Sequence, residues 1–410
     1  MGNMHKNTLT LSDAIRISKP LKYNLMIKTA GPMCNLNCDY CYYLDKSIFY
    51  QDRKMMPLDL LEKIIKEYIE TNAAEEIVFN WHGGEPLIIG LNYYKDVVKL
   101  QNKYRSNRKI FNTLQTNATL IDSDYASFFK DNNFLLGVSI DGPQDIHDKC
   151  RKYKNGTPSF GKVLKGIELL HRYNVDFNTM TTVNKYSEGR GLEVYQFMKY
   201  IGSRYMQFMP VVEYVDSSNH IVPPNTEDSH LASWSVDAYA YGKFMCDIFD
   251  YWVKNDVGTY FVNLFDSTLA NWCGLDAGCC AYSDTCGLNA VVEHNGDVYP
   301  CDHFVYPDYK LGNLSETSIY DMMTSNKMTR FGIDKRNALP NKCIRCDYLF
   351  ACHGECPKHR FNQTDNGEMG LSYLCLGYKS FYSHVKPYMD KMKELLMSHR
   401  APSEIMNITL

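Results

Sequence analysis

The chain has 410 residues, of which 45% are hydrophobic and 22% charged, the composition of an ordinary globular protein. The formal net charge is −3 and no basic block is present, so the sequence gives no electrostatic support for nucleic-acid binding. No apolar run approaches the length needed to span a membrane, and the polar residues 1–11 contain no apolar signal-peptide core, so we expect no membrane contact.

Strand-like and helix-like segments alternate from residue 21 onward, after an expected loosely packed extension over 1–20. Six such units in succession predict a parallel sheet. We therefore expect an α/β fold, a partial (β/α)6 barrel like an incomplete TIM barrel, over 21–265; a doubly wound sheet would produce the same alternation. The predicted strands are 22–28, 76–81, 109–115, 134–140, 175–183 and 204–210, and the predicted helices are 57–70, 92–105, 123–132, 161–173, 190–201 and 234–254.

The pattern changes after about residue 266. Nine of the fifteen cysteines lie between Cys279 and Cys375, among Gly, Asn and Pro residues with little periodicity. Such a segment cannot build much apolar core, so we expect metal sites to hold an irregular domain over 266–377 together. A helix is predicted over 378–397, within a C-terminal segment of 378–410. Fifteen cysteines without a secretory signal favour metal-bound thiolates in the reducing cytoplasm over disulfides.

The first cysteine cluster is Cys34, Cys38 and Cys41, a C-x3-C-x2-C run placed directly after the first predicted strand, with Tyr40 before its last cysteine. Iron–sulfur clusters are normally held by four cysteines. Three ligands therefore leave one metal position open, as in catalytic rather than structural zinc sites. A partial zinc site and ordinary core cysteines are the alternatives.

Polar and glycine residues follow several predicted strands where parallel α/β barrels place their chemistry. Gly83, Gly84 and Glu85 follow the second strand, and two glycines allow close backbone approach to a ligand. Ser139 ends the fourth strand, and Arg151 follows it with a planar fork suited to a carboxylate. Turn and helix-capping roles are the ordinary alternative for these residues.

The cysteine-rich segment offers enough thiolates for two four-cysteine sites. Iron–sulfur clusters and four-cysteine zinc sites use similar spacings, so spacing does not separate them. Cys279 adjoins Cys280 and competes with it as a ligand. The candidate ligands are Cys280, Cys286, Cys301, Cys343, Cys346, Cys352, Cys356 and Cys375.

Two aspartates compete for the role of a general base. Asp266 lies where the predicted barrel ends, and Asp302 directly follows Cys301. Asp302 has the stronger physical case, because a cluster on its neighbour would hold the carboxylate beside an electron acceptor. We expect a partly buried carboxylate with a raised pKa.

The cysteine run and the strand-end motifs resemble those of radical S-adenosylmethionine (SAM) enzymes. The resemblance implies that Cys34, Cys38 and Cys41 hold a cluster whose open iron chelates SAM. It also implies that Gly83, Gly84 and Glu85 bind the SAM amino group. The resemblance further implies that Tyr40, Ser139, Arg151 and, by its position in the strand 204–210, Met206 belong to the SAM site.

The later cysteine segment resembles a SPASM domain. The resemblance implies two auxiliary clusters and so three 4Fe–4S clusters in all. The resemblance implies that one auxiliary cluster is bound by Cys280, Cys286, Cys301 and Cys356. It implies that the distal cluster is bound by Cys343, Cys346, Cys352 and Cys375. The assignment of Cys356 to the earlier trio comes from the family and not from spacing.

Together, from about residue 21 to past 388, the chain resembles the anaerobic sulfatase-maturating enzymes. The resemblance implies an oxidoreductase that converts a Cys or Ser of an unfolded sulfatase to Cα-formylglycine. The resemblance further implies that a 5′-deoxyadenosyl radical abstracts hydrogen from Cβ, that Asp302 acts as the general base, and that an auxiliary cluster accepts the electron. A flavodoxin- or ferredoxin-like electron donor is also implied.

Another SPASM-type peptide-modifying enzyme, for example one that forms thioethers, is the alternative; such enzymes often carry an amino-terminal recognition domain, for which only about 20 residues are present. A zinc-scaffolded interaction protein or an electron carrier would leave the open three-cysteine site unexplained. The sequence leaves the choice between Ser- and Cys-type substrates open.

Overall fold

Six parallel strands in chain order form the centre of the molecule, as the alternating pattern predicted. The computed structural model describes residues 20–44, 46, 50, 55–223 and 226–409. The predicted extension over 1–20 lies almost wholly outside this range. The six strands are β1 (Asn24–Lys28), β2 (Glu76–His82), β3 (Lys109–Thr116), β4 (Phe134–Ser139), β5 (Phe177–Val183) and β6 (Tyr205–Pro210).

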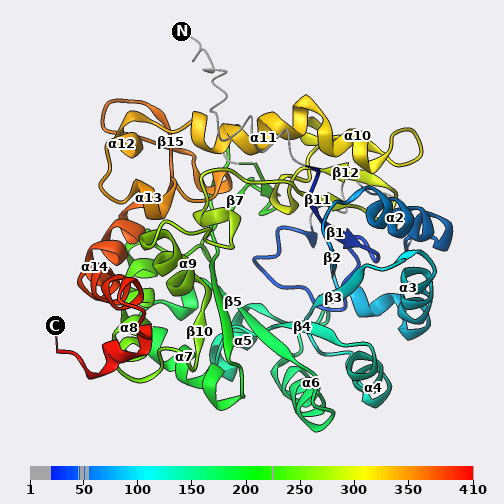
Figure 1. Cartoon of the computed structure of the whole chain (residues 1–410), viewed down its shortest axis with the longest axis horizontal. Coiled ribbons are helices and arrows are strands. Elements are labelled where there is room, and N and C mark those ends of the chain that lie inside the picture. The colour runs from blue at the N-terminus through cyan, green and yellow to red at the C-terminus, as the bar shows by residue number, and fades with distance from the viewer. Residues whose placement is uncertain (1–19, 45, 47–49, 51–54, 224–225, 410) are drawn as a thin grey trace.

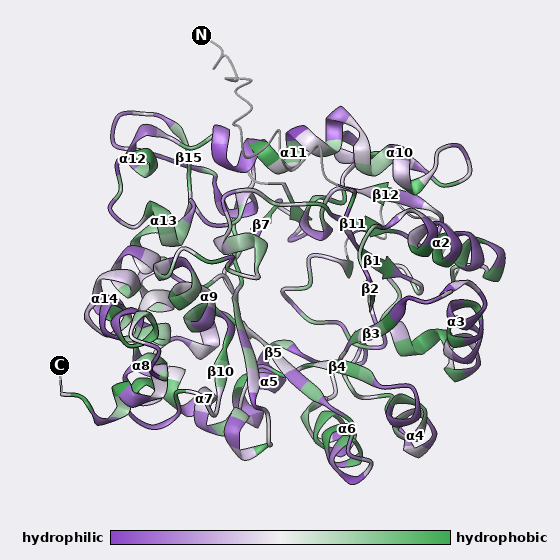
Figure 2. Cartoon of the chain, viewed as in Figure 1, coloured by the Kyte–Doolittle hydropathy of each residue, from purple (hydrophilic) through white to green (hydrophobic). Residues whose placement is uncertain are grey.

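The strands trace an open arc with the major helices along its outside (Figure 1). This arrangement confirms the partial barrel and excludes a doubly wound sheet, in which helices would cover both faces. Hydrophobic and hydrophilic residues alternate along these helices (Figure 2), as one buried face requires. The helices are α2 (Leu58–Thr71), α3 (Leu91–Tyr104), α4 (Ser123–Asp131), α5 (Gln144–Cys150), α6 (Phe160–Arg172), α7 (Gly191–Tyr200) and α8 (Ala238–Asn255).

The sheet extends beyond the six strands on both sides and does not close. β10 (Phe261–Val262) pairs with β6, and β11 (Asn289–Val292) pairs in parallel with β1. β12 (Asp297–Tyr299) and β13 (Gly312–Asn313) then continue the sheet in antiparallel fashion. The first strands of the cysteine-rich segment are thus part of the barrel sheet. Strands this short give no periodic signal in a sequence.

The rest of the cysteine-rich segment consists of short elements above the opening of the arc (Figure 1). The C-terminal helix begins at Cys375, three residues before its predicted start at 378. The predicted domain boundary between residues 265 and 266 falls inside the helix α9 (Asn263–Trp272) and stays a prediction. The elements are α9 (Asn263–Trp272), α10 (Ile319–Thr324), α11 (Asn326–Asn337), α12 (Asn341–Ile344), α13 (Leu349–Cys352), β14 (Asn362–Gln363), β15 (Met369–Leu371) and α14 (Cys375–Met397).

Three two-residue strands form a small separate sheet in the segment between β6 and α8. They are β7 (Tyr214–Val215), β8 (Ile221–Val222) and β9 (His230–Leu231). Among the described residues, no helix has both the length and the apolar character needed to cross a bilayer.

The C-terminal helix is fastened to the barrel by backbone contact between α8 and α14. A Cβ atom on Gly377 would lie 1.9 Å from the carbonyl oxygen of Ala238, and one on Gly242 would lie 2.4 Å from the carbonyl oxygen of Gly377. Distances this short exclude any side chain at either position. Two glycines therefore bring the helices together along the left side of the molecule (Figure 1).

We expect Gly377→Ala to lower the free energy of unfolding by about 1–3 kcal/mol, because the added methyl group must push the two helices apart. Gly161 in α6 has open space around its Cα, so Gly161→Ala is expected to raise the same quantity by about 0.5–1 kcal/mol. Urea denaturation of the two variants measures both effects. Equal stability of the Gly377 variant and the parent chain would contradict the close contact.

Candidate cluster and cofactor site

The three-cysteine run lies inside the arc, in the segment that follows β1 (Figure 1). Its backbone is bonded to the chain just after α5: the Asn37 amide donates to the Lys152 carbonyl at 2.8 Å, and the Asp39 amide to the Cys150 carbonyl at 3.2 Å. Within the run, the Cys41 amide donates to the Cys38 carbonyl at 3.0 Å. These backbone bonds hold the loop in place, together with side-chain hydrogen bonds made by Asn35 and Tyr40.

The thiols of Cys34, Cys38 and Cys41 are partly exposed and close enough for their charges to interact. Burial raises the pKa of Cys34 to about 12, with further increases from Glu85 and Cys41. Burial also raises the pKa of Cys38, and the Arg151 cation opposes that shift. Three neighbouring soft donors beside a buried guanidinium suit an iron–sulfur cluster, whose positive irons remove the mutual repulsion of the thiolates.

The Gly83–Glu85 segment lies directly against the residues that precede the cysteine run. The Gly84 amide donates to the Gly31 carbonyl and the Glu85 amide to the Met33 carbonyl, both at 2.8 Å. A Cβ atom on Gly84 would lie 2.1 Å from the Met33 carbonyl oxygen. The glycine is thus required for this approach, and the motif sets the position of the cysteine run.

The Glu85 carboxylate is fully buried and ties the end of β3 to this segment. Its Oε1 accepts from the Leu87 amide at 3.1 Å and the Thr116 hydroxyl at 2.8 Å, and its Oε2 accepts from the Asn117 amide at 2.8 Å. Burial raises the pKa of Glu85 to about 7 despite these bonds. In this structure Glu85 organises the strand ends.

Tyr40 and Arg151 meet on a third residue, the buried Asp141. The Tyr40 hydroxyl donates to Asp141 Oδ2 at 2.5 Å, and Arg151 Nε donates to Oδ1 at 3.1 Å. The Arg151 guanidinium carbon lies 5.6 Å from the centre of the Tyr40 ring. Two predicted site residues from separate segments are thus brought together, and Asp141 holds their orientation.

Ser139 and Met206 lie at different depths in the barrel. Gln115 Nε2, at the end of β3, donates to Ser139 Oγ at 2.8 Å, so the ends of β3 and β4 present adjacent polar side chains. Met206 on β6 is buried in the core and pairs in register with Thr179 on β5.

Asp302 belongs to the auxiliary segment and contacts two residues that flank the cysteine run. Lys28 Nζ, at the end of β1, forms an ion pair with Asp302 Oδ1, and the Tyr42 hydroxyl donates to Oδ2. Asp266, the competing acid, lies in the first turn of α9 and makes no hydrogen bond or ion pair within the described part of the chain.

The expectation of a raised pKa for Asp302 is wrong. Burial acts in that direction, but Lys28, His82 and His303 together hold the pKa well below its ordinary value. The His82 imidazole accepts from the Gly83 amide at 2.8 Å, and burial lowers its pKa to about 4. Because the carboxylate is paired with a buried ammonium, the charged form is favoured.

Four cysteines of the auxiliary segment form a group next to Asp302. Burial and the neighbouring Cys356 raise the pKa of Cys301. The charges of Cys280 and Cys286 in turn contribute to the raised pKa of Cys356. The thiol of Cys356 lies 3.8 Å from His303 Nδ1. This proximity supports the assignment of Cys356 to the earlier trio, which spacing did not provide.

The neighbouring thiols Cys279 and Cys280 face different surroundings. Cys279 packs against the apolar core and contributes to the raised pKa values of Tyr241, Tyr282 and Tyr382. Cys280 is exposed and interacts with the other cysteines of its group. This supports Cys280 as the ligand.

The second group consists of Cys343, Cys346, Cys352 and Cys375, whose charges interact with one another. Burial and then Cys375 raise the pKa of Cys343 to about 11, and burial raises that of Cys352 to about 12. Among the described residues, no three His, Cys, Asp or Glu side chains converge on one point suited to a single metal ion.

Arg360 lies between the two groups and binds the loop that contributes to both, Cys352–Cys356. Its Nε donates to the Gly354 carbonyl at 2.7 Å, and its Nη2 donates to the carbonyls of His353 at 2.8 Å and Glu355 at 2.9 Å. Its Nη1 donates to the Lys335 carbonyl. The buried Lys335 in turn binds the carbonyls of Cys280, Ala281 and Ser283. The partly buried Arg360 and the buried Lys335 therefore shape the loops that carry the cysteines.

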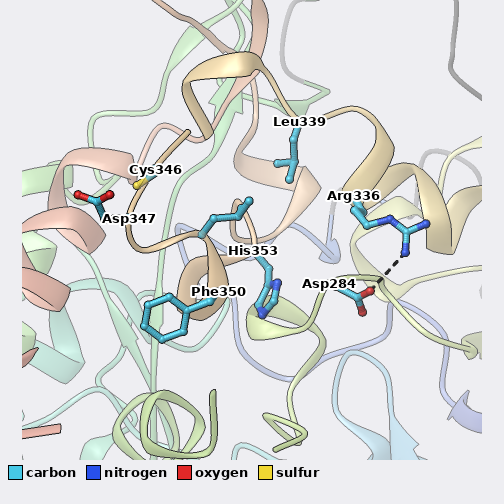
Figure 3. Close-up of a pocket in the computed structure, with 8 residues that line it drawn as sticks. Asp284, Arg336, Leu339, Cys346, Asp347, Phe350 and His353 are labelled. Atoms are coloured by element: carbon cyan, nitrogen blue, oxygen red, sulfur yellow. Dashed lines mark hydrogen bonds and ion pairs between the residues drawn. The ribbon is translucent and has the colours of Figure 1, made fainter. Parts of the chain in front are cut away.

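A pocket of about 480 Å³ adjoins the second cysteine group. Cys346, Leu339, Phe350 and His353 line it, and Arg336 pairs with Asp284 at its rim (Figure 3). A second pocket, of about 640 Å³, lies at the amino ends of β4, β5 and β6. Neither pocket is lined by the first cysteine run or by Asp302, so neither coincides with the site on which the strand ends converge.

Two family models match the chain. The Radical SAM superfamily matches residues 29–198, and the iron–sulfur cluster-binding domain named SPASM matches residues 280–347. The second match decides between iron–sulfur and zinc for that segment in favour of iron–sulfur. Both matches confirm the resemblance found in the sequence.

Curated relatives and solved structures point to one group of enzymes. The chain is 48% identical to the serine-type anaerobic sulfatase-maturating enzyme of Bacteroides thetaiotaomicron, over 95% of each chain. It is 33% identical to the cysteine-type enzyme of Clostridium novyi, over 88% of this chain and 94% of the relative. The solved structure described as native anSMEcpe with bound AdoMet and Cp18Cys peptide superposes with a TM-score of 0.80, at 29% identity, over 91% of this chain and 99% of that chain.

Several residues of the site were missed by the sequence analysis. Lys28, Tyr42, Asp141 and Arg360 all bind candidate site residues or the loops that carry them. A lysine as the last residue of a buried parallel strand is the one available signal, because an ionisable group there must find a partner. The other three contacts join segments that no local pattern relates.

Glu85→Ala should lower the free energy of unfolding by about 1–3 kcal/mol, because two buried backbone amides lose their acceptor. The exposed Glu75, which has no side-chain partner among the described residues, provides the control Glu75→Ala. Thermal unfolding of the two variants measures the difference. Equal midpoints would show that water replaces the Glu85 carboxylate without cost.

Arg360→Met should lower the iron content per chain, because three carbonyls of the loop between the cysteine groups and the carbonyl of Lys335 lose their donor. Iron analysis of anaerobically reconstituted protein checks this. The exposed Arg345, whose side chain has no hydrogen-bond or ion-pair partner among the described residues, allows the control Arg345→Met, which should retain its iron. Full iron content in the Arg360 variant would remove the structural role.

Proposed function

We infer that this chain, which belongs to the anaerobic sulfatase-maturating enzymes of the radical SAM superfamily, oxidises a Cys or Ser residue of an unfolded sulfatase to Cα-formylglycine. One observation supports this function above all others. Tyr42, which follows Cys41, is hydrogen-bonded to Asp302, which follows Cys301. The candidate base therefore lies between the cysteines of the SAM site and those of an auxiliary site.

The chain's own donors would hold the cofactors. Cys34, Cys38 and Cys41 would hold the cluster that binds SAM, and each of the two cysteine groups would hold one auxiliary cluster, which makes three 4Fe–4S clusters. When bound, these cofactors supply a 5′-deoxyadenosyl radical for hydrogen abstraction from Cβ and acceptors for the released electron. The residues proposed to contact SAM are Tyr40, Gly83, Gly84, Glu85, Ser139, Arg151 and Met206.

Asp302 supplies the proton acceptor. Because its pKa lies below the ordinary value, the carboxylate is ionised at neutral pH and ready to receive a proton. Among the described residues, its Oδ2 accepts a hydrogen bond from the Tyr42 hydroxyl alone, a neutral donor that a substrate hydroxyl or thiol can replace. The Arg151–Asp141–Tyr40 contact keeps a cation beside the cysteine run without exposing it to water.

The partners follow from the same proposal. The substrate is a sulfatase polypeptide in extended, unfolded form, and the electron donor is a flavodoxin- or ferredoxin-like protein. We place the reaction in the cytoplasm, where the many cysteines stay reduced. The higher identity to the serine-type relative favours a Ser substrate. Incubation with matched Ser and Cys peptides, followed by mass measurement of the products, tests this choice.

Cys34→Ala should abolish 5′-deoxyadenosine formation from SAM under a strong reductant, because the cluster loses one of its three ligands. Chromatographic measurement of 5′-deoxyadenosine checks it. Cys246 in α8 lies in neither cysteine group, so Cys246→Ala should retain the product. Continued formation in the Cys34 variant would overturn the assignment of the first cluster.

Asp302→Asn should retain SAM cleavage but lower formylglycine formation by about 10²-fold or more, because the amide cannot accept the substrate proton. Mass spectrometry of the peptide measures the product. Asp308 is exposed and serves as the control, so Asp308→Asn should behave as the parent enzyme. A normal formylglycine yield from the Asp302 variant would exclude it as the base.

A further inference from the structure

Lys28 is a fully buried lysine at the carboxyl end of β1, with an exposure of 0%. Its Nζ contacts Asp302 Oδ1 and lies 3.4 Å from the centre of the Tyr43 ring. A buried ammonium is costly unless it is paired. A lysine kept at such a place therefore indicates a role that its charge performs.

The surroundings of Lys28 leave Asp302 as its counter-charge. Burial lowers the pKa of His82 to about 4, and the positive charge of Lys28 contributes to that decrease. The charge of Lys28 also helps to lower the pKa of the buried Lys46. The nearby Glu293 accepts a hydrogen bond from the Tyr43 hydroxyl at 2.6 Å, and Tyr43 lies against Lys28 through its ring. Of the described carboxylates, only Asp302 forms an ion pair with Lys28.

We propose that Lys28 is a positioning residue for the oxidation: it holds Oδ1 of Asp302 so that Oδ2 faces the substrate and receives the proton. The inference rests on the proposed role of Asp302 as the base. The two oxygens have different partners, an ammonium from the barrel strand on Oδ1 and a phenol on Oδ2.

The two contacts differ in how easily they can be exchanged. The Tyr42 hydroxyl is a neutral donor of the same type as a serine hydroxyl, so substrate can take its place at Oδ2. The ammonium–carboxylate contact is charge-assisted and buried, and is therefore the stronger of the two. In the proton transfer the substrate O–H or S–H bond breaks, an O–H bond forms at Oδ2, and Lys28 keeps all of its protons.

The test compares the two products of the reaction. Lys28→Met removes the charge and keeps the length of the side chain. It should leave 5′-deoxyadenosine formation within about twofold of the parent and raise the ratio of 5′-deoxyadenosine to formylglycine about tenfold or more, since a displaced carboxylate is a poorly placed base. The peptide KM should change little, because the effect falls on the proton transfer. Lys22→Met, at an exposed position beside the same strand, is the control and should not change the ratio.

A double variant separates positioning from stability. Lys28→Met combined with Asp302→Asn should show the same product ratio as Asp302→Asn alone, because Lys28 acts through Asp302. Iron content and thermal unfolding are measured for every variant. If Lys28→Met does not accumulate as folded protein, Lys28→Arg, which keeps the charge but moves it, should give a ratio between those of the parent and Asp302→Asn.

The positioning role of Lys28 and the base role of Asp302 are contradicted by different results. A proportional fall of both products in Lys28→Met, or a further loss in the double variant, would overturn the positioning role. An unchanged ratio in Lys28→Arg, where only that variant folds, would do the same. A normal ratio in Asp302→Asn would instead remove the base assignment itself, whatever Lys28 does.

Discussion

The pairing of β1 with strands on both of its sides is the constraint on which the rest of the structure depends. β1 lies between β2 and β11, in parallel register with each. The cysteine run follows β1 and the glycine motif follows β2, and parallel neighbours end at the same edge of a sheet, so these two segments begin close together. The chain continues from β11 into the antiparallel β12, and the ion pair between Lys28 and Asp302 connects the residues after β12 to the end of β1. The barrel and the cysteine-rich segment are therefore joined by main-chain hydrogen bonds as well as by side chains.

Two ion pairs between buried or partly buried side chains lie near this junction. Lys28 from β1 meets Asp302 from the auxiliary segment, and Arg151 meets Asp141 across the turn that ends β4. In surroundings of low polarity an unpaired charge would be costly, so each pair constrains the relative position of its two segments. The same pairing lowers the pKa of Asp302, although burial opposes it. Position and protonation state thus have one cause.

Elsewhere in the chain, close contact between two backbones sets the relative position of two segments. Gly84 allows the chain after β2 to touch the residues before Cys34, and Gly377 allows α14 to touch α8. Between the two auxiliary cysteine groups, Arg360 satisfies the carbonyls of a loop that has almost no apolar side chains to pack. The cysteine-rich segment therefore has an organised backbone of its own, on which cluster ligation builds.

The sequence by itself determined the parallel arrangement of six strands, the places where they end, the C-terminal helix and the grouping of cysteines along the chain. Periodicity and spacing depend on local backbone geometry, which a sequence displays directly. Only the tertiary structure decided that β11 joins β1, that Cys356 lies with the earlier trio, that Lys28 and Tyr42 hold Asp302, and that the pKa of Asp302 is lowered rather than raised. These features depend on contacts between residues up to 274 positions apart, and such contacts are selected by burial and charge pairing in the folded chain, for which no local pattern exists.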